Sequence, residues 1–220
     1  MEANRSADDA RMHGHRGSVV EHVGQHHRND DPENDEAFAA LTAEIPAPYA
    51  AVLTGDRTLV LKRTADTSVT VASFTFNIVE GQDKSIYAIG GAAGSAITQF
   101  ATVDTNPAPA ATQARVRLVH LSPTAGSVDV FVTSVGADLA AATPTLSNVA
   151  YRAVSAYLTL APGTYQIRAV PAGTAAAQRA ANVVINVPSQ AFTGGTGRTI
   201  VAADNTTGGT PLRAFVLTDR

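Results

Sequence analysis

Two stretches of this 220-residue sequence resemble each other and lie about 110 residues apart. The matched residues are strand-forming hydrophobic and aromatic residues, a turn glycine and an aspartate. The matched pairs are Tyr49 and Tyr157, Gly55 and Gly163, Leu59 and Ile167, Phe100 and Phe215, and Asp104 and Asp219. Because the units of solenoid proteins are far shorter than this spacing, it predicts two copies of one domain. Residues of these kinds define strands and turns, and they do not by themselves indicate a chemical activity.

The composition argues against several kinds of partner and site. The net charge of −3 and the pI of about 6.0 argue against nucleic-acid binding, because phosphate contacts need clustered Lys and Arg. The absence of cysteine removes disulfides, thiolate nucleophiles and cysteine-containing metal sites. The apolar runs are too short to cross a bilayer, so no transmembrane segment is expected. No cofactor is predicted either.

Residues 1–45 differ from the rest of the chain. They hold five of the six histidines, many charged residues and a single aromatic residue, Phe38. Such a polar segment is expected to be disordered, apart from a helix that Pro32 could begin and Pro46 would end. An alternative is that this segment is an out-of-frame translation of DNA that encodes the missing first strands. As written, it has no apolar core that could serve as a signal peptide.

From residue 46 onward the sequence has the pattern of β-strands. Residues 46–105 read as a partial repeat, 106–113 as a linker rich in Pro and Ala, and 114–220 as a complete domain of seven short strands. The seven predicted strands are Arg115–Leu121, Val128–Val132, Val154–Leu160, Tyr165–Val170, Val183–Val187, Arg198–Ala202 and Arg213–Leu217. This pattern predicts an all-β fold, an antiparallel immunoglobulin-like β-sandwich in tandem, with one copy complete and one incomplete.

The histidines of the N-terminal region are the nearest approach to a metal cluster. They are His13, His15, His22, His26 and His27. A structural metal site needs ligands that are held rigidly by neighbouring groups. A polar tail does not provide such support, so no metal site is predicted.

His120, Ser122 and Asp129 invite comparison with a catalytic triad. However, no Gly-x-Ser-x-Gly turn raises the serine, and Ser122-Pro123 is typical of a turn. We therefore expect His120 to form a structural hydrogen bond with the turn or with Asp129. No catalytic residue is predicted.

Two glycine-rich segments, residues 90–94 and 194–198, could be compared with phosphate-binding loops. Such loops lie between a strand and the N-terminus of a helix, and neither segment precedes a helical pattern. Both are therefore interpreted as loops between strands. Residues 204–207 are likewise interpreted as a loop.

Three segments in the second half carry a family resemblance. Ala114–Val132 contains a His-x-Ser-Pro sequence and Val128-Asp129-Val130, and it is followed by Leu146–Gly173 and Arg213–Arg220. Together they resemble the family called domain of unknown function 4397. The resemblance implies a β-sandwich module of secreted and envelope proteins, often in tandem and without an established activity. It covers 114–220 as a complete copy, whereas residues 49–105 resemble only the second half of the module. Thr124 stands where an acidic residue is common, so no role of that carboxylate is carried over.

These observations predict a non-enzymatic protein of the cell envelope or exterior that acts as a binding or spacer module. Its partner would be an envelope protein or a glycan. Loops at one end of the sandwich are expected to form the contact surface, namely Ser122–Gly126, Pro162–Gly163 and Gly194–Gly197. The alternatives are a hydrolase acting on envelope polymers, which would need paired carboxylates, and a truncated fragment without independent function.

Overall fold

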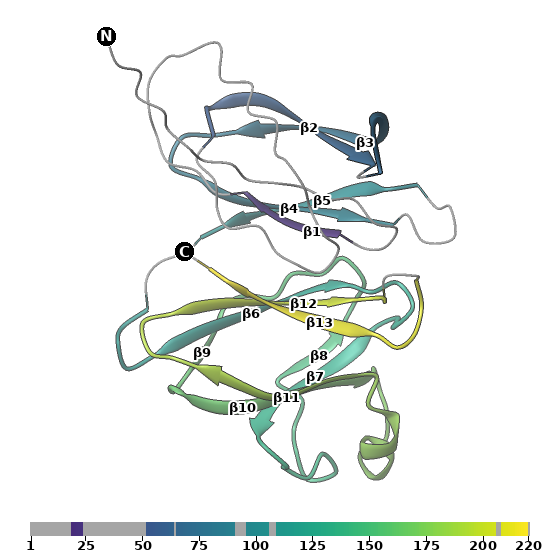
Figure 1. The fold of residues 1–220 in the computed structure, drawn as a ribbon. Helices are drawn as coiled ribbons and strands as arrows, with labels where there is room; N and C mark the ends of the chain where they lie inside the picture. The colour runs from purple at the N-terminus through teal and green to yellow at the C-terminus, as the bar shows by residue number, and fades with distance from the viewer. Residues whose placement is uncertain are drawn as a thin grey trace. The chain divides into compact units, whose positions relative to one another are not determined.

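The computed structural model describes residues 52–63, 65–90, 96–105, 109–205 and 208–219, together with the backbone of 19–23. The chain divides into two compact units, Met1–Thr105 and Asn106–Arg220. The described residues form strands, turns and two short 3-10 helices, with no α-helix among them. The predicted all-β class is therefore confirmed for these parts of the chain (Figure 1).

The second unit contains two four-stranded sheets that face each other across an apolar core (Figure 1). One sheet has the strand order β11-β10-β7-β8 and the other β13-β12-β6-β9. The strands are β6 (Ala114–Leu121), β7 (Val128–Ser134), β8 (Leu146–Val149), β9 (Leu158–Leu160), β10 (Gly163–Pro171), β11 (Ile185–Phe192), β12 (Gly197–Ala203) and β13 (Arg213–Thr218). The 3-10 helices η2 (Ala176–Gln178) and η3 (Ala180–Asn182) lie between β10 and β11. The predicted sandwich is thus present in this unit.

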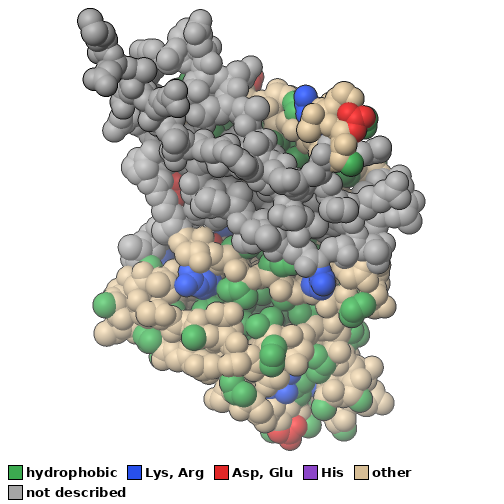
Figure 2. Space-filling view, in the orientation of Figure 1, with side chains coloured by type: hydrophobic (Ala, Val, Ile, Leu, Met, Phe, Trp, Pro, Cys, Tyr) green, Lys and Arg blue, Asp and Glu red, His purple; other side chains and the backbone are tan. Residues whose placement is uncertain are grey.

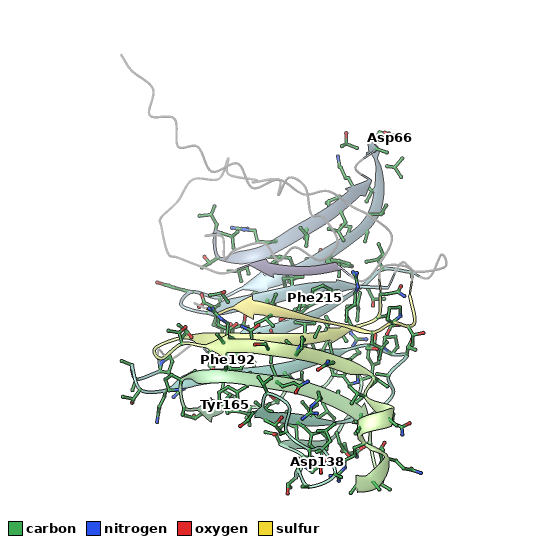
Figure 3. All side chains as sticks on the ribbon, turned by 60° about the horizontal axis from the view of Figure 1, so that its bottom comes forward. Asp66, Asp138, Tyr165, Phe192 and Phe215 are labelled. Carbon is green, nitrogen blue, oxygen red and sulfur yellow. The ribbon has the colours of Figure 1, made fainter. Side chains whose placement is uncertain are left out.

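Alternating apolar side chains from both sheets fill the core of the second unit. The buried side chains are Ala114, Val116, Leu118, Val128, Val130, Val149, Ile167, Ala169, Ile185, Phe192, Ile200 and Ala202. The Phe192 ring packs against Tyr165 on the neighbouring strand, with the ring centroids 5.9 Å apart (Figure 3). The two-residue period of each strand directs these side chains to one face, so the sequence pattern accounts for the core.

Three details of the second unit differ from the sequence prediction. The segment predicted as one strand, Val154–Leu160, forms only the short strand β9, and Val154 makes an isolated bridge to Val119. Strand β8 was not predicted at all. In addition, β6 and β12 are parallel, with Arg115 opposite Gly197 and Leu121 opposite Ala203. The sheet is therefore mixed, whereas the prediction was purely antiparallel, because pairing between strands so distant in sequence leaves no local signal.

The first unit contains a three-stranded sheet, β1-β4-β5, and a two-stranded sheet, β2-β3. The strands are β1 (Val19–Val23), β2 (Gly55–Arg63), β3 (Asp66–Ile78), β4 (Asp83–Ile89) and β5 (Thr98–Asp104). Their buried side chains form a smaller cluster that joins the two sheets, made of Leu59, Leu61, Phe74, Phe76, Ile78, Ile86 and Ala88.

The strand registers relate the first unit to part of the second. Gly55 lies opposite Ile78 in β2-β3 as Gly163 lies opposite Phe192 in β10-β11. Likewise, β4 and β5 pair as β12 and β13 do, with Phe100 opposite Tyr87 and Phe215 opposite Val201. Within the described residues of the first unit, no strand corresponds to β7, β8 or β9. The described strands of the first unit thus correspond to only part of the second unit.

Strand β1 lies in the segment that was predicted to be disordered or helical. It runs antiparallel beside β4, at the position that corresponds to the parallel strand β6 beside β12. A backbone ladder to β4 orders these five residues, and the polar composition of the segment gave no sign of it. The other residues of 1–45, including the predicted helix, lie outside the described residues.

Candidate functional site

A polar cluster lies where β6 and β12 end. These strands are parallel, with Leu121 opposite Ala203, so the residues that follow them meet at one edge of the sheet. Ser122 follows β6 and Asp204 follows β12, and both are buried. His120, which is fully buried, is the last polar residue of β6. The parallel pairing thus brings together residues that are far apart in sequence.

The Asp204 carboxylate is the centre of this cluster. One oxygen accepts a hydrogen bond from the Ser122 hydroxyl. The other accepts from the Thr124 hydroxyl at 2.6 Å and from the Gly209 backbone N–H at 3.1 Å. The Ser122 hydroxyl oxygen in turn accepts the Ala125 N–H at 3.2 Å. Asp204 therefore connects the loop after β6 to the loop after β12, and its role is to hold two loops together.

His120 is held as a neutral side chain. Its Nε2 lies 2.7 Å from the Gly126 carbonyl oxygen, so Nε2 carries the hydrogen and donates it. Its Nδ1 then accepts the Ser122 backbone N–H at 3.4 Å. Burial lowers the pKa of His120 below 6.5, an effect that outweighs the Gly126 hydrogen bond and the charge of Asp204, both of which raise it.

The structure does not assemble the triad that the sequence suggested. His120 bonds to the turn, as predicted, through Gly126. Asp129 instead accepts the backbone N–H groups of Asn148 at 2.8 Å and Gly173 at 3.0 Å. The proton of the Ser122 hydroxyl points to Asp204, a residue that the sequence analysis had placed in a loop. Only the parallel register of β6 and β12 would have revealed Asp204 as the partner of Ser122.

A second polar cluster surrounds Asp219, one of the residues repeated in the sequence. Thr199 donates its hydroxyl to Asp219 at 2.7 Å, and Arg117 Nε donates to the same hydroxyl at 2.7 Å. The Tyr157 hydroxyl donates to the other Asp219 oxygen at 2.9 Å. The Arg117 guanidinium also lies 5.1 Å from the centre of the Tyr157 ring, which is a cation–π contact.

The same arrangement recurs in the first unit. Asp104, the counterpart of Asp219, accepts hydrogen bonds from Ser85 on the neighbouring strand and from Thr102 at 2.8 Å. Ser85 and Thr199 occupy matching positions in the two ladders. The aspartate is repeated because in each unit it receives a hydroxyl from the strand beside it, which is a structural role.

The loops predicted to share one end of the sandwich lie at two ends. Because β6 and β12 are parallel, Ser122–Gly126, which follows β6, lies opposite to Gly194–Gly197, which precedes β12. Pro162–Gly163 lies with the latter, since a side chain at Gly194 would come within 3.2 Å of Pro162. The contact surface predicted from the sequence is therefore wrong as a single surface.

The predicted absence of a metal site concerned histidines whose side chains lie outside the described residues. Where side chains are described, no group of three or more His, Asp or Glu is placed to hold a metal ion. In the same residues, no helix is long and apolar enough to span a membrane.

A change of His120 to Gln is expected to remove a pH dependence from the stability of the second unit. The unfolded histidine titrates near pH 6.5 and the folded one at lower pH, so protons bind preferentially to the unfolded chain as the pH falls below about 6.5. The unfolding free energy therefore has its full value above that pH and declines below it as His120 is protonated in the unfolded chain. The Gln amide can still donate to the Gly126 carbonyl, and it does not titrate.

The measurement is urea denaturation of both chains in steps from pH 7.5 to pH 5. We expect the difference in unfolding free energy between wild type and His120→Gln to shift in favour of the variant as the pH falls. If this difference is constant over the whole range, the pKa of His120 is not lowered by folding.

Comparison with known proteins supports the repeat. The profile of the family described as "Domain of unknown function (DUF4397)" matches residues 31–131 and 133–220. The two matched segments meet within β7, whereas the compact units meet between Thr105 and Asn106. No curated protein matches the chain. The two matches together span most of the sequence and agree with one complete and one partial copy, so this chain belongs to the DUF4397 family.

Proposed function

We propose that this chain is a non-enzymatic protein of the cell envelope or exterior whose second unit is a rigid module for binding or spacing. The polar side chains that most resemble catalytic groups already form internal hydrogen bonds, and this observation carries the proposal. His120, Ser122 and Asp129 each form hydrogen bonds that hold a loop in place. A general base must instead be able to reach a substrate proton.

The end of the sandwich that contains the Asp204 cluster is the better candidate for a contact surface. Asp204 joins residues 122–127 to Gly209, and groups that are already held in place lose little entropy when they bind a partner. Pro123, Thr124 and Ser127 are exposed there. Residues 122–127 and 208–212 contain no acidic side chain. The neighbouring Asp204 is acidic, but its charge is satisfied by internal hydrogen bonds. These features favour an uncharged polar ligand, such as a glycan or a polar segment of an envelope protein.

The visible surface is consistent with this choice of ligand. In Figure 2 the charged side chains on the coloured part of the molecule are few and separated from one another. A ligand recognised mainly by charge would need a cluster of one sign. Hydrogen bonding and shape are therefore the expected sources of affinity.

A glycan array and an envelope-protein array probed with the full chain test this function. We expect a ligand whose binding is lost in Ser127→Arg and kept in Ala161→Arg. Both positions are small and exposed, and they lie at opposite ends of the second unit. If both variants lose binding equally, the Asp204 end is not the contact surface. If neither array yields a ligand, the binding role is rejected and the spacer role remains. Turnover in a hydrolase panel that disappears in His120→Ala would contradict the non-enzymatic proposal.

The proposed location outside the cytoplasm rests on the family resemblance. Fractionation of the native cells and sequencing of the mature N-terminus test it. We expect the protein in the envelope or the medium. A mature protein in the cytosol that begins at Met1 or Glu2 would contradict export.

A further inference from the structure

We propose that the first unit associates with a second copy of this chain through strand β2, with two β2 strands paired antiparallel about a two-fold axis. Strand β2 is the counterpart of β10. In the second unit β10 pairs with β11 on one side and β7 on the other. In the first unit, among the described strands, β2 pairs with β3 alone. The edge that β7 covers in the complete copy is therefore not paired with any described strand in the partial copy.

Strand β2 has the alternation of a strand that can extend a sheet. Leu59 and Leu61 are buried in the apolar cluster of the first unit. Thr58, Val60 and Lys62 point to the other face and are exposed, with Val60 at 39%. A strand added beside β2 would continue both faces, and an edge strand of this kind is a template for pairing with another chain.

The charged residues of β2 favour a second β2 strand as the partner. In an antiparallel two-fold pair, the buried residues of one β2 strand must lie opposite buried residues of the other. A shift of the register by one residue would exchange the buried and the exposed face. The pairing that overlaps the whole of Gly55–Arg63 is centred on Leu59. It places Asp56 of each copy opposite Lys62 of the other on the exposed face, so two opposite-charge pairs form at once. Such cross-strand pairs favour the register in which they occur.

The sheet formed by this pairing has as many strands as the corresponding sheet of the complete copy. Two β2-β3 sheets joined through β2 form a four-stranded sheet, as in the β11-β10-β7-β8 sheet of the second unit. Leu59 of the two copies would lie opposite each other on the buried face, next to the apolar side chains that each unit already packs against it. The self-pairing thus supplies the edge contact that β7 makes in the second unit.

Analytical ultracentrifugation of the full chain over a range of concentrations tests the proposal. We expect a dimer for the wild type and a dissociation constant weaker by about tenfold or more for Lys62→Glu, because both charge pairs become repulsive. The double variant Asp56→Lys with Lys62→Glu reverses the two charges and should return most of the affinity. Asp56 and Lys62 are exposed, so these variants are expected to fold.

A charge change elsewhere serves as the control. Asp138→Lys alters an exposed loop of the second unit (Figure 3) and should leave the association unchanged. A wild-type chain that stays monomeric at 100 μM, a concentration of about 10⁻⁴ M at which even weak specific pairs associate, would overturn the proposal. A dimer that is insensitive to Lys62→Glu, or that the double variant does not restore, would overturn it as well.

Discussion

Replacing Asp204 by Ala should destabilise the second unit by about 2–4 kcal/mol, since buried donors left without a partner cost about 1–3 kcal/mol each. The Ser122 hydroxyl is fully buried and would lose its acceptor. The Gly209 N–H would also lose its acceptor, whereas the exposed Thr124 hydroxyl can turn to water. The substitution would therefore separate the two loops that follow β6 and β12.

Two variants control this expectation. Asp204→Asn keeps the volume and one acceptor oxygen, so its cost should be clearly smaller than that of Asp204→Ala. Asp138→Ala removes a carboxylate that caps an exposed loop through the Ala140 N–H and should change stability by less than about 1 kcal/mol. Guanidinium denaturation gives the free energies, and hydrogen exchange at β6 and β12 locates the effect. A cost for Asp204→Ala no larger than that for Asp138→Ala would show that the Asp204 cluster does not stabilise the fold.

Replacing Gly194 by Ala should destabilise the second unit by about 1–3 kcal/mol, the usual cost of inserting atoms where the backbone leaves no room. A Cβ at this position would lie 1.8 Å from the carbonyl oxygen of Ala111. The neighbouring Gly195 donates its N–H to the carbonyls of Ala110 at 3.2 Å and Gln113 at 2.9 Å. The added methyl group would therefore push apart the segment before β6 and the loop before β12.

Gly163→Ala is the matched control at the same end of the sandwich. Its Cβ would meet the Tyr165 ring at 3.4 Å, which is an ordinary contact with a side chain that can move. We expect little change in the thermal midpoint for this variant and a drop of several degrees for Gly194→Ala. Equal effects of the two substitutions would show that the approach of Ala111 to Gly194 is not a structural requirement.

Much of the strand content was predictable because it depends on local pattern. Alternating apolar residues identified β7, β10 and β12 close to their observed bounds. The spacing between Gly55 and Gly163 predicted the correspondence of β2 with β10, which the strand registers confirm. The prediction that His120 bonds the turn was also correct, since a His next to Ser-Pro has a nearby carbonyl available in Gly126.

The failures share a physical origin in pairing between distant segments. The parallel register of β6 and β12 has no local signature, so neither the partnership of Ser122 with Asp204 nor the separation of the loops to two ends was foreseen. The same holds for β1, whose order depends on β4. The predicted strand Val154–Leu160 fails in the same way, because the Ser155 side chain, and not a backbone carbonyl, accepts the Leu118 N–H at 2.9 Å, so that only Leu158–Leu160 continues as a strand.

The second unit is a complete sandwich, whereas the described strands of the first unit form only part of one. Denaturant unfolding of residues 110–220 alone and of residues 46–108 alone tests this difference most directly. We expect a single cooperative transition for residues 110–220, because both sheets and the core between them lie within that segment. We expect no cooperative transition for residues 46–108, because the described strands of this segment include no counterpart of β7, β8 or β9. A cooperative transition in the shorter fragment, or none in the longer one, would contradict the assignment of a partial and a complete copy.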